Sequence, residues 1–341
     1  MRLRRYGCSV LRRHQVVAIG HAIVDELAHV SEDDLVLRGT QKGSMSLVGP
    51  EDRDRLRLGL PVSATASGGS AANTAAGLAL MGASVAFVGR VGDDELGRAF
   101  EAGLEDLGVS FAGIRSDRDS TGNCVVMVTP DGERTMCTYL GAGAQLGPDD
   151  LDQSLVASAS LCYLEGYLWD SPTAGPMARL AARLCREGGG RVVLSLSDAG
   201  CVQRHYGAFQ ELLDGGEGGV DIVFGNEDEM RELTASEDPV PKMKALSHSG
   251  VISVMTRAER GSVVTAGGQS HAVQAVSVPK VIDATGAGDL YAAGFLRGLL
   301  AGADLRVCAR AGSEAASRVL GQMGARPEYL GDLPAAVGLA Q

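Results

Sequence analysis

Short apolar runs and longer helical stretches alternate along most of this chain, and the alternation limits the folds open to it. Strands that alternate with helices form right-handed βαβ units, which produce a mostly parallel sheet covered by helices on both faces. The runs at 161–164, 191–196 and 221–224 are almost continuously apolar, as strands buried on both faces are. We therefore expect an α/β protein with one large domain over residues 15–335.

The individual elements are predicted from apolar periodicity, helix caps and turn residues. The expected strands are 15–20, 85–88, 124–128, 161–164, 191–196, 221–224, 251–255 and 262–265. The expected helices are 70–81, 95–107, 172–187, 202–213, 227–233, 239–247, 287–300 and 306–322.

Two regions, about 33–67 and 110–140, interrupt the alternation. In the second, Pro130, Asp131 and Gly132 read as a hairpin turn between two short strands. Together the regions are expected to form a small β-flap, or lid, that excludes water from a ligand beyond the carboxyl ends of the strands. The alternative is a pair of ordinary surface insertions.

Composition restricts partners and compartment. The net charge of −11 disfavours binding to nucleic acid or anionic membranes, and no apolar run reaches the ~20 residues of a membrane span. The seven cysteines are scattered without a C-x-x-C pair, which argues against a disulfide framework or a zinc site. Residues 1–14 carry five arginines and no acid, and lack a signal-peptide core. We expect a disordered basic extension on a cytoplasmic protein.

The segment 283–289 (DATGAGD) leads directly into an apolar helix. Small residues before a helix let an anion approach unpaired N–H groups at the positive end of the helix dipole, which is a phosphate site. Asp289 would stand beside that phosphate, where a hydroxyl nucleophile needs a general base. Alternatively, the segment is a glycine-rich turn, and Asp289 is a first-turn carboxylate that stabilises its own helix.

Three further constellations are weaker alone. The segment 67–73 (SGGSAAN) is a second glycine-rich turn before a helix, where Ser70 would otherwise serve as an N-cap. Asp25 follows the first strand and suits a substrate diol, although a solvated loop carboxylate is the commoner case. The segment 225–229 (GNEDE) offers oxygen ligands for hydrated magnesium or, alternatively, favourable charges in a first helical turn.

Taken in this order, the motifs make the chain resemble the ribokinase-like (PfkB-type) kinases, over about residues 15–330. The two signatures are 68–73 and 283–289, and no Walker P-loop occurs, as expected for that family. The chain is most similar to the adenosine-kinase branch and its bacterial neighbours described as sugar kinases. This closer likeness lies in the segments 20–25, 131–134, 138–141, 165–170 and 221–229.

The resemblance implies transfer of the ATP γ-phosphoryl group to a hydroxymethyl group. Asp289 is expected to be the general base, and the N–H groups of Gly286, Ala287 and Gly288 are expected to form the anion hole. The residues expected to hold the ribose hydroxyls are Asp25, Gly68, Gly69 and Asn73.

The same resemblance implies the nucleotide and metal contacts. Asn226 and Glu229 match the family's N-x-x-E motif, which arranges Mg²⁺ and phosphates through water. Thr256 and Gly261 are expected to border ATP. Arg134, on the flap, is expected to swing onto the phosphates on closure.

The resemblance also bears on three further positions. A monovalent-cation site, K⁺ in many family members, is expected near Asp283 and Thr285. The adenosine-kinase branch usually has Asn where this chain has His21, which is expected either to contact the acceptor or to be a core histidine without substrate contact.

The implied reaction is ATP-dependent phosphorylation of a ribosyl substrate, adenosine giving AMP and ADP. The alternatives are a sugar kinase acting on ribose or fructose and a non-catalytic nucleotide or sugar sensor. The expected assembly is a monomer or a homodimer.

Overall fold

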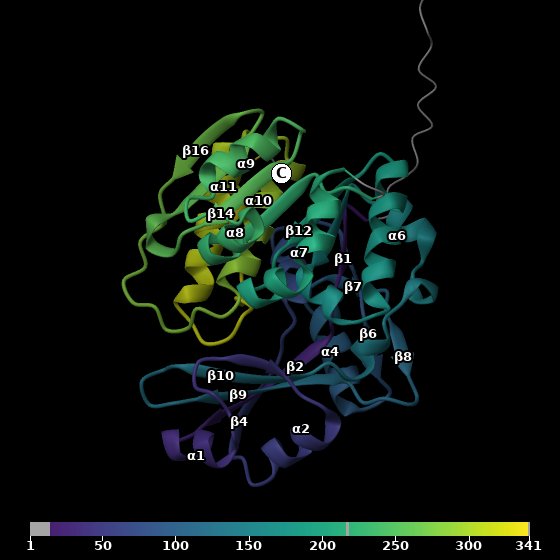
Figure 1. Ribbon diagram of the computed structural model, residues 1–341, viewed down its shortest axis with the longest axis vertical. Coiled ribbons are helices and arrows are strands. Elements are labelled where there is room, and N and C mark those ends of the chain that lie inside the picture. Colours follow the sequence, from purple (N-terminus) through teal and green to yellow (C-terminus); the bar gives the residue numbers. More distant parts are fainter. Residues whose placement is uncertain (1–13, 216–217, 340–341) are drawn as a thin grey trace, which may run out of the picture.

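The computed structural model describes residues 14–215 and 218–339, so the basic extension predicted at the N-terminus lies almost wholly outside the described residues. Within this part, nine strands form the main sheet, in the order β16-β15-β14-β13-β12-β11-β1-β5-β7 (Figure 1). Neighbouring strands are parallel except at the edge, where β15 is antiparallel to β14 and to β16. The strands are β1 (Val16–Ile19), β5 (Val85–Val88), β7 (Val109–Phe111), β11 (Leu161–Glu165), β12 (Arg191–Ser195), β13 (Ile222–Asn226), β14 (Ile252–Thr256), β15 (Ser262–Ala266) and β16 (Gln269–Val273).

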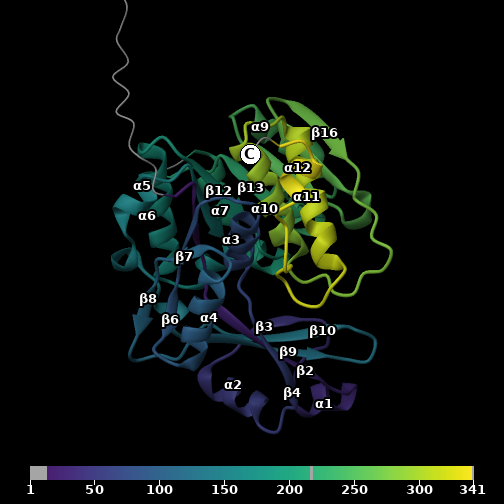
Figure 2. The same cartoon turned by 180° about the vertical axis from the view of Figure 1, so that it is seen from behind.

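Helices cover both faces of this sheet, because alternate strand residues point to opposite sides. In β1, Val16 and Ala18 belong to one core and Val17 and Ile19 to the other. The first face, nearer the viewer in Figure 2, carries α3 (Ser70–Leu80), α4 (Glu95–Glu105), α10 (Ala287–Leu300), α11 (Leu305–Leu320) and α12 (Leu333–Ala336). The second face carries α5 (Gln153–Ala157), α6 (Ala174–Glu187), α7 (Ala199–Leu213), α8 (Glu227–Thr234) and α9 (Val240–Ser247).

A separate sheet forms a lid below the main body in Figure 1. Its order is β3-β10-β9-β2-β4, and β9 and β10 pair antiparallel as the predicted hairpin. The strands are β2 (Ile23–His29), β3 (Met45–Leu47), β4 (Val62–Ser67), β9 (Gly122–Val128) and β10 (Arg134–Tyr139), and the lid helices are α1 (Glu32–Leu37) and α2 (Pro50–Arg57). A small parallel pair links β6 (Arg90–Gly92) to β8 (Ile114–Ser116).

The two faces of the lid sheet have different surroundings. Val125 and Met127 of β9 pack with Leu35 of α1 and Leu56 of α2, on the outer side. Cys124 and the other alternate residues of β9 belong to a small cluster on the opposite face, toward the main body. The lid therefore presents an apolar surface to whatever lies between it and the main sheet.

The structure corrects the expected extent of the lid in two places. β2 lies outside both expected lid insertions, yet it pairs with β4 and β9 in the middle of the lid sheet. Asp25 therefore lies within a lid strand, not at the end of the first strand. Residues 110–121 do not belong to the lid sheet, because β7 joins the main sheet and β8 pairs with β6.

The remaining helical segments are short 3₁₀ turns: η1 (Gly141–Gln145), η2 (Pro148–Asp150), η3 (Gly166–Asp170) and η4 (Ala258–Arg260). None of the helices in the described part of the chain is both long and apolar enough to cross a bilayer.

Candidate active site

The start of α10 is shaped by two glycines with different surroundings. Gly286 has φ +78°, and a Cβ there would lie 2.6 Å from the carbonyl oxygen of Ala325. A Cβ on Gly288 would meet nothing within 4 Å. The N–H of Ala287 donates to Ala284 O at 3.2 Å, whereas the N–H of Gly288 has no acceptor among the described residues. This open, unpaired end of a helix is suited to an anion.

Asp289 follows in the first turn of α10, and α3 fixes its carboxylate. Ser70 Oγ donates to Oδ1 at 2.7 Å, and Asn73 Nδ2 donates to Oδ2 at 3.0 Å. Burial raises the pKa of Asp289 to about 6, while these two hydrogen bonds lower it against that effect. A carboxylate with such a pKa is ionised at neutral pH and still basic enough to accept a proton.

Asn73 lies at the site, but its amide is occupied by protein groups. Its Oδ1 accepts a hydrogen bond from Arg326 Nε at 2.9 Å, and its Nδ2 binds Asp289. Sequence reasoning missed Arg326, which belongs to no motif and lies 253 positions further along the chain. Both polar atoms of the Asn73 amide are therefore bonded to protein groups, and one of them fixes the Asp289 carboxylate.

Asp25 reaches the site from the lid, and glycines make room for it. A Cβ on Gly68 would lie 2.6 Å from Asp25 Oδ2, and a Cβ on Gly69, which has φ +85°, would lie 2.6 Å from His21 O. Burial raises the pKa of Asp25 to about 7, although the charge of Arg326 lowers it. The two glycines thus allow the turn before α3 to approach the end of β1 and the start of β2.

Glu165, at the end of β11, is a second site residue that sequence reasoning missed. Its Oε1 accepts the N–H of His21 at 2.7 Å, and its Oε2 accepts the N–H of Ala71 at 2.8 Å. The residue is 1% exposed, and burial raises its pKa to about 7. The contact between the turn after β1 and the start of α3 depends on this carboxylate.

His21 is a buried residue whose ring Nε2 lies 3.2 Å from the carbonyl oxygen of Tyr167. A carbonyl only accepts, so Nε2 carries the proton in this contact. Burial lowers the pKa of His21, which keeps the ring neutral. His21 therefore borders the site as an uncharged group.

One cavity of about 200 Å³ between the lid and the main sheet is lined by His21, Asp25, Asn73, Glu165 and Asp289, but not by Gly286, Gly288 or Arg326. Its floor is polar and comes from the strand ends and helix starts of the main body, together with Asp25 of lid strand β2. Its roof comes from the lid and is apolar except for Thr138. The floor contains His21, Asp25, Gly69, Ser70, Asn73, Glu165, Tyr167, Asp170, Thr285 and Asp289. The roof contains Ile23, Met45, Leu47, Cys124, Met136, Thr138 and Leu140.

Asp170 also lines the cavity, and it belongs to the one group of three metal-ligand side chains found in the described residues, with Cys201 and His205. Both oxygens of Asp170 are already bonded: Arg204 donates to them at 2.9 and 2.8 Å, and His205 Nε2 lies 2.7 Å from Oδ1. The group is thus an ion-pair cluster at the rim.

Arg134 connects the lid to the segment before α10. Its Nη2 lies 2.5 Å from Asp283 Oδ2, and its Nη1 donates to Thr285 Oγ1. Asp283 also accepts N–H groups from Thr285 and Gly324, at 2.9 and 2.8 Å. The side chains expected to hold a monovalent cation are therefore bonded to a guanidinium, and they do not fit K⁺ in this arrangement.

Asn226 and Glu229 form a reciprocal cap at the start of α8. The Asn226 backbone N–H and Nδ2 donate to Glu229 at 3.0 and 2.6 Å, and Glu229 N–H donates to Asn226 Oδ1 at 2.9 Å. Burial raises the pKa of Glu229 to about 7. A carboxylate with both oxygens already hydrogen-bonded fits Mg²⁺ through a bridging water better than by direct ligation.

The expected nucleotide residues lie next to this cap. Thr256 pairs with Asn226 in the parallel register of β13 and β14. Gly261 has φ +78°, and a Cβ there would lie 2.0 Å from Val273 O, so no other residue fits this turn. The structure thus brings Asn226, Glu229 and Thr256 to one edge of the sheet, where α/β proteins bind ligands.

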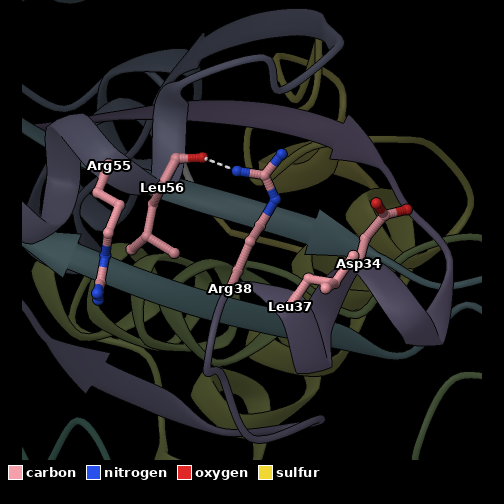
Figure 3. Close-up of a pocket in the computed structure, with 5 residues that line it drawn as sticks. All are labelled: Asp34, Leu37, Arg38, Arg55 and Leu56. Atoms are coloured by element: carbon pink, nitrogen blue, oxygen red, sulfur yellow. Dashed lines mark hydrogen bonds between the residues drawn. The ribbon is translucent and has the colours of Figure 1, made fainter.

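A second hollow, of about 260 Å³, lies between α1 and α2 (Figure 3). Arg38 Nη1 donates to Leu56 O at 2.6 Å across it. The hollow is lined by Asp34, Leu37, Arg38, Arg55 and Leu56. None of the expected site residues borders it. The cavity under the lid is the candidate site because it is lined by His21, Asp25, Gly69, Asn73, Thr285 and Asp289.

Comparison with known proteins decides the family. The family model for pfkB family carbohydrate kinases matches residues 61–329. The chain belongs to the PfkB family. Its ribokinase-like α/β fold agrees with the crystal structure of a probable sugar kinase from Rhizobium etli, with a TM-score of 0.90, 36% identity, and coverage of 97% of this chain and 100% of that one.

Adenosine kinases are also among the relatives of this PfkB protein. The structure from Sinorhizobium meliloti has a TM-score of 0.89 and 40% identity, covering 96% of this chain and 100% of that one. The adenosine kinase of Schizophyllum commune is 30% identical over 282 residues, which is 76% of this chain and 80% of that protein. The chain is therefore an ATP-dependent kinase of the sugar and nucleoside class.

Proposed function

We propose that this kinase phosphorylates the primary hydroxyl of adenosine, giving AMP and ADP, with Asp289 as general base. The observation that carries the proposal is the division of the cavity into a polar floor and an apolar roof. A nucleoside divides in the same way: its ribose needs polar partners such as Asp25, and its flat base can lie against Ile23, Met136 and Leu140. A free sugar carries hydroxyls on all sides, and those facing the roof would lose water without gaining a partner.

The remaining roles follow from the positions of the side chains. Gly286 and Gly288 would offer the transferring phosphoryl group an open helix end, which stabilises developing charge without reorganisation. Glu229 would hold Mg²⁺ through water, and Mg²⁺ would neutralise phosphate charge when bound. The guanidinium of Arg134 would leave Asp283 and bind the ATP phosphates instead. The proposed compartment is the cytoplasm, which supplies ATP.

A second candidate, a free sugar such as ribose or fructose, is favoured by the size of the cavity. At about 200 Å³ it is smaller than the roughly 300–1,000 Å³ typical of ligand pockets. A sugar would use the same base and anion site. The two candidates therefore differ only in what contacts the roof.

The test measures ADP release with Mg-ATP and a panel of adenosine, other nucleosides, ribose and fructose. Asp289→Ala serves as the inactive control, and ATP binding is measured separately by calorimetry. Turnover restricted to adenosine supports the proposal, and turnover restricted to a sugar replaces it with the second candidate. If ATP binds but no acceptor in the panel is phosphorylated, the non-catalytic sensor becomes the better account.

A further inference from the structure

Arg326 lies where the chain returns to the active site after α11. The two residues before it already contact the segment that precedes α10: Gly324 N–H donates to Asp283 Oδ2 at 2.8 Å, and Ala325 packs against Gly286. The guanidinium of Arg326 extends from there to the start of α3. Figure 2 shows α3, α10 and α11 on the same side of the main sheet.

The hydrogen bonds of Arg326 fix the orientation of an amide. Its Nε donates to Asn73 Oδ1 at 2.9 Å, and its Nη2 donates to Gly68 O at 2.8 Å. A guanidinium can only donate, so the atom of Asn73 that faces it must be the oxygen. The NH₂ group of Asn73 is then directed to Asp289 Oδ2, at 3.0 Å.

The positive charge of Arg326 acts on two carboxylates at once. It lowers the pKa values of Asp25 and Asp289, both of which burial raises. Burial lowers the pKa of Arg326 itself to about 10, so the group stays charged at neutral pH. The other charged or titratable groups facing these two carboxylates from neighbouring elements are Cys124, Arg134, Tyr163, Glu165, Glu229 and Asp283.

We propose that Arg326 is a positioning residue for phosphoryl transfer: it orients the Asn73 amide so that Asp289 is held as a carboxylate directed at the acceptor. Without Arg326, the amide is free to turn its oxygen toward Asp289, which would repel a carboxylate and favour its protonated form. The proposal rests on the proposed role of Asp289 as the base. Arg326 itself contacts neither acceptor nor ATP in this assignment.

The test compares Arg326→Met and Arg326→Lys by the pH dependence of kcat and of kcat/KM for the phosphorylated acceptor, between about pH 5 and 9. The positive charge of Arg326 lowers the pKa of Asp289, so its removal in Arg326→Met should raise that pKa. The acid limb of the pH–rate profile should therefore move to higher pH by about one unit. The kcat of this variant at pH 7 should fall about 10- to 100-fold and recover partly at higher pH. Arg326→Lys keeps the charge, so its acid limb should stay in place while kcat falls.

Arg318→Met is the matched control, because Arg318 is also near the end of α11 but forms an exposed ion pair with Asp332; its kinetics should equal those of the wild type. An unchanged acid limb in Arg326→Met, with only a lower melting temperature, would overturn the proposal. If that variant does not fold, Arg326→Lys decides, and an unchanged kcat there also overturns it. Asp289→Asn separates the role of Asp289 as base from the role of Arg326 as positioning residue. If Asp289→Asn retains turnover, Asp289 is not the base. If Asp289→Asn loses turnover while the Arg326 variants have normal kinetics, only the positioning role is excluded.

Discussion

The helices α3 and α10 begin with similar sequences, but the N–H groups at their N-termini have different partners. Each follows a glycine in a left-handed or extended positive-φ conformation, Gly69 at +85° and Gly286 at +78°, and each continues with small residues. At α3, the N–H of Ala71 is bonded to the buried carboxylate of Glu165. At α10, the N–H of Gly288 has no acceptor among the described residues, and the space beside it is open.

The difference indicates that, of the two glycine-rich helix starts, only that of α10 is left vacant for an anion. Both starts carry the partial positive charge of a helix N-terminus. The protein fills the first with its own carboxylate and thereby turns α3 into a support for Asp289. Variants at the start of α3 should therefore lose stability, whereas variants at the start of α10 should lose affinity for ATP.

The largest effect is expected where the two helix starts meet, at Asp289. Asp289→Asn keeps the shape but removes the proton acceptor, so kcat should fall by about 10²–10⁴-fold. ATP affinity, measured by calorimetry, should remain close to that of the wild type. Turnover near the wild-type rate would show that the carboxylate is not the base.

Glu165→Ala should destabilise the protein at the start of α3, which the carboxylate of Glu165 occupies. Two buried N–H groups, of His21 and Ala71, would lose their acceptor, at about 1–3 kcal/mol each. Chemical denaturation measures this loss, with the exposed Glu187→Ala as control. If Glu165→Ala is as stable as the wild type, Glu165 does not act as the internal anion of α3.

Asp25→Ala should weaken binding of the acceptor and leave binding of ATP unchanged. A hydrogen bond to a charged group contributes about 1.5–3 kcal/mol, so the acceptor KM should rise about 10- to 100-fold. The exposed Asp33→Ala, also in the lid, is the matched control. An unchanged acceptor KM would remove Asp25 from the binding site.

Gly288→Ala tests the open helix start. The added methyl meets nothing within 4 Å in the protein, so stability should stay within about 0.5 kcal/mol of the wild type. The methyl would crowd a bound phosphate instead, and the KM for ATP should rise about 10-fold. Gly207→Ala, at an exposed position inside α7 with equally free space, should leave the KM for ATP unchanged and should raise stability by about 0.5–1 kcal/mol, because alanine favours a helix interior over glycine. A normal KM for ATP in Gly288→Ala would place the phosphates elsewhere.

The smallest effect is expected from Ser70→Ala, which removes one of the two side-chain donors to Asp289. Those hydrogen bonds lower the pKa of the base, so their loss should raise it above about 6. The acid limb of kcat/KM should then move to higher pH, and kcat at pH 7 should fall only a few-fold. A shift to lower pH would contradict the assigned hydrogen bond.

The α/β architecture and the two helix starts were predictable because they depend on local pattern: apolar periodicity for the sheet and helices, and glycines before apolar helices for the turns. β2 was not predictable in the same way, because its sequence, IVDELAH, has no alternation and becomes a strand only between β4 and β9. Glu165 and Arg326 were missed for a related reason. Their partners lie 94 and 253 positions away. No motif marks Arg326, and the likeness of the segment 165–170 to the adenosine-kinase branch assigns no role to Glu165.

The strand that carries Asp25 is also part of the lid, and only residues 20–22 separate it from β1 of the main sheet. Displacing the lid would therefore withdraw Asp25, the proposed ligand of the acceptor, as well as the roof above it. Admission of solvent, loss of the proposed diol contact and release of the phosphorylated product would then be a single kinetic event. In such an enzyme the turnover number is limited by how fast the lid opens whenever phosphoryl transfer is faster.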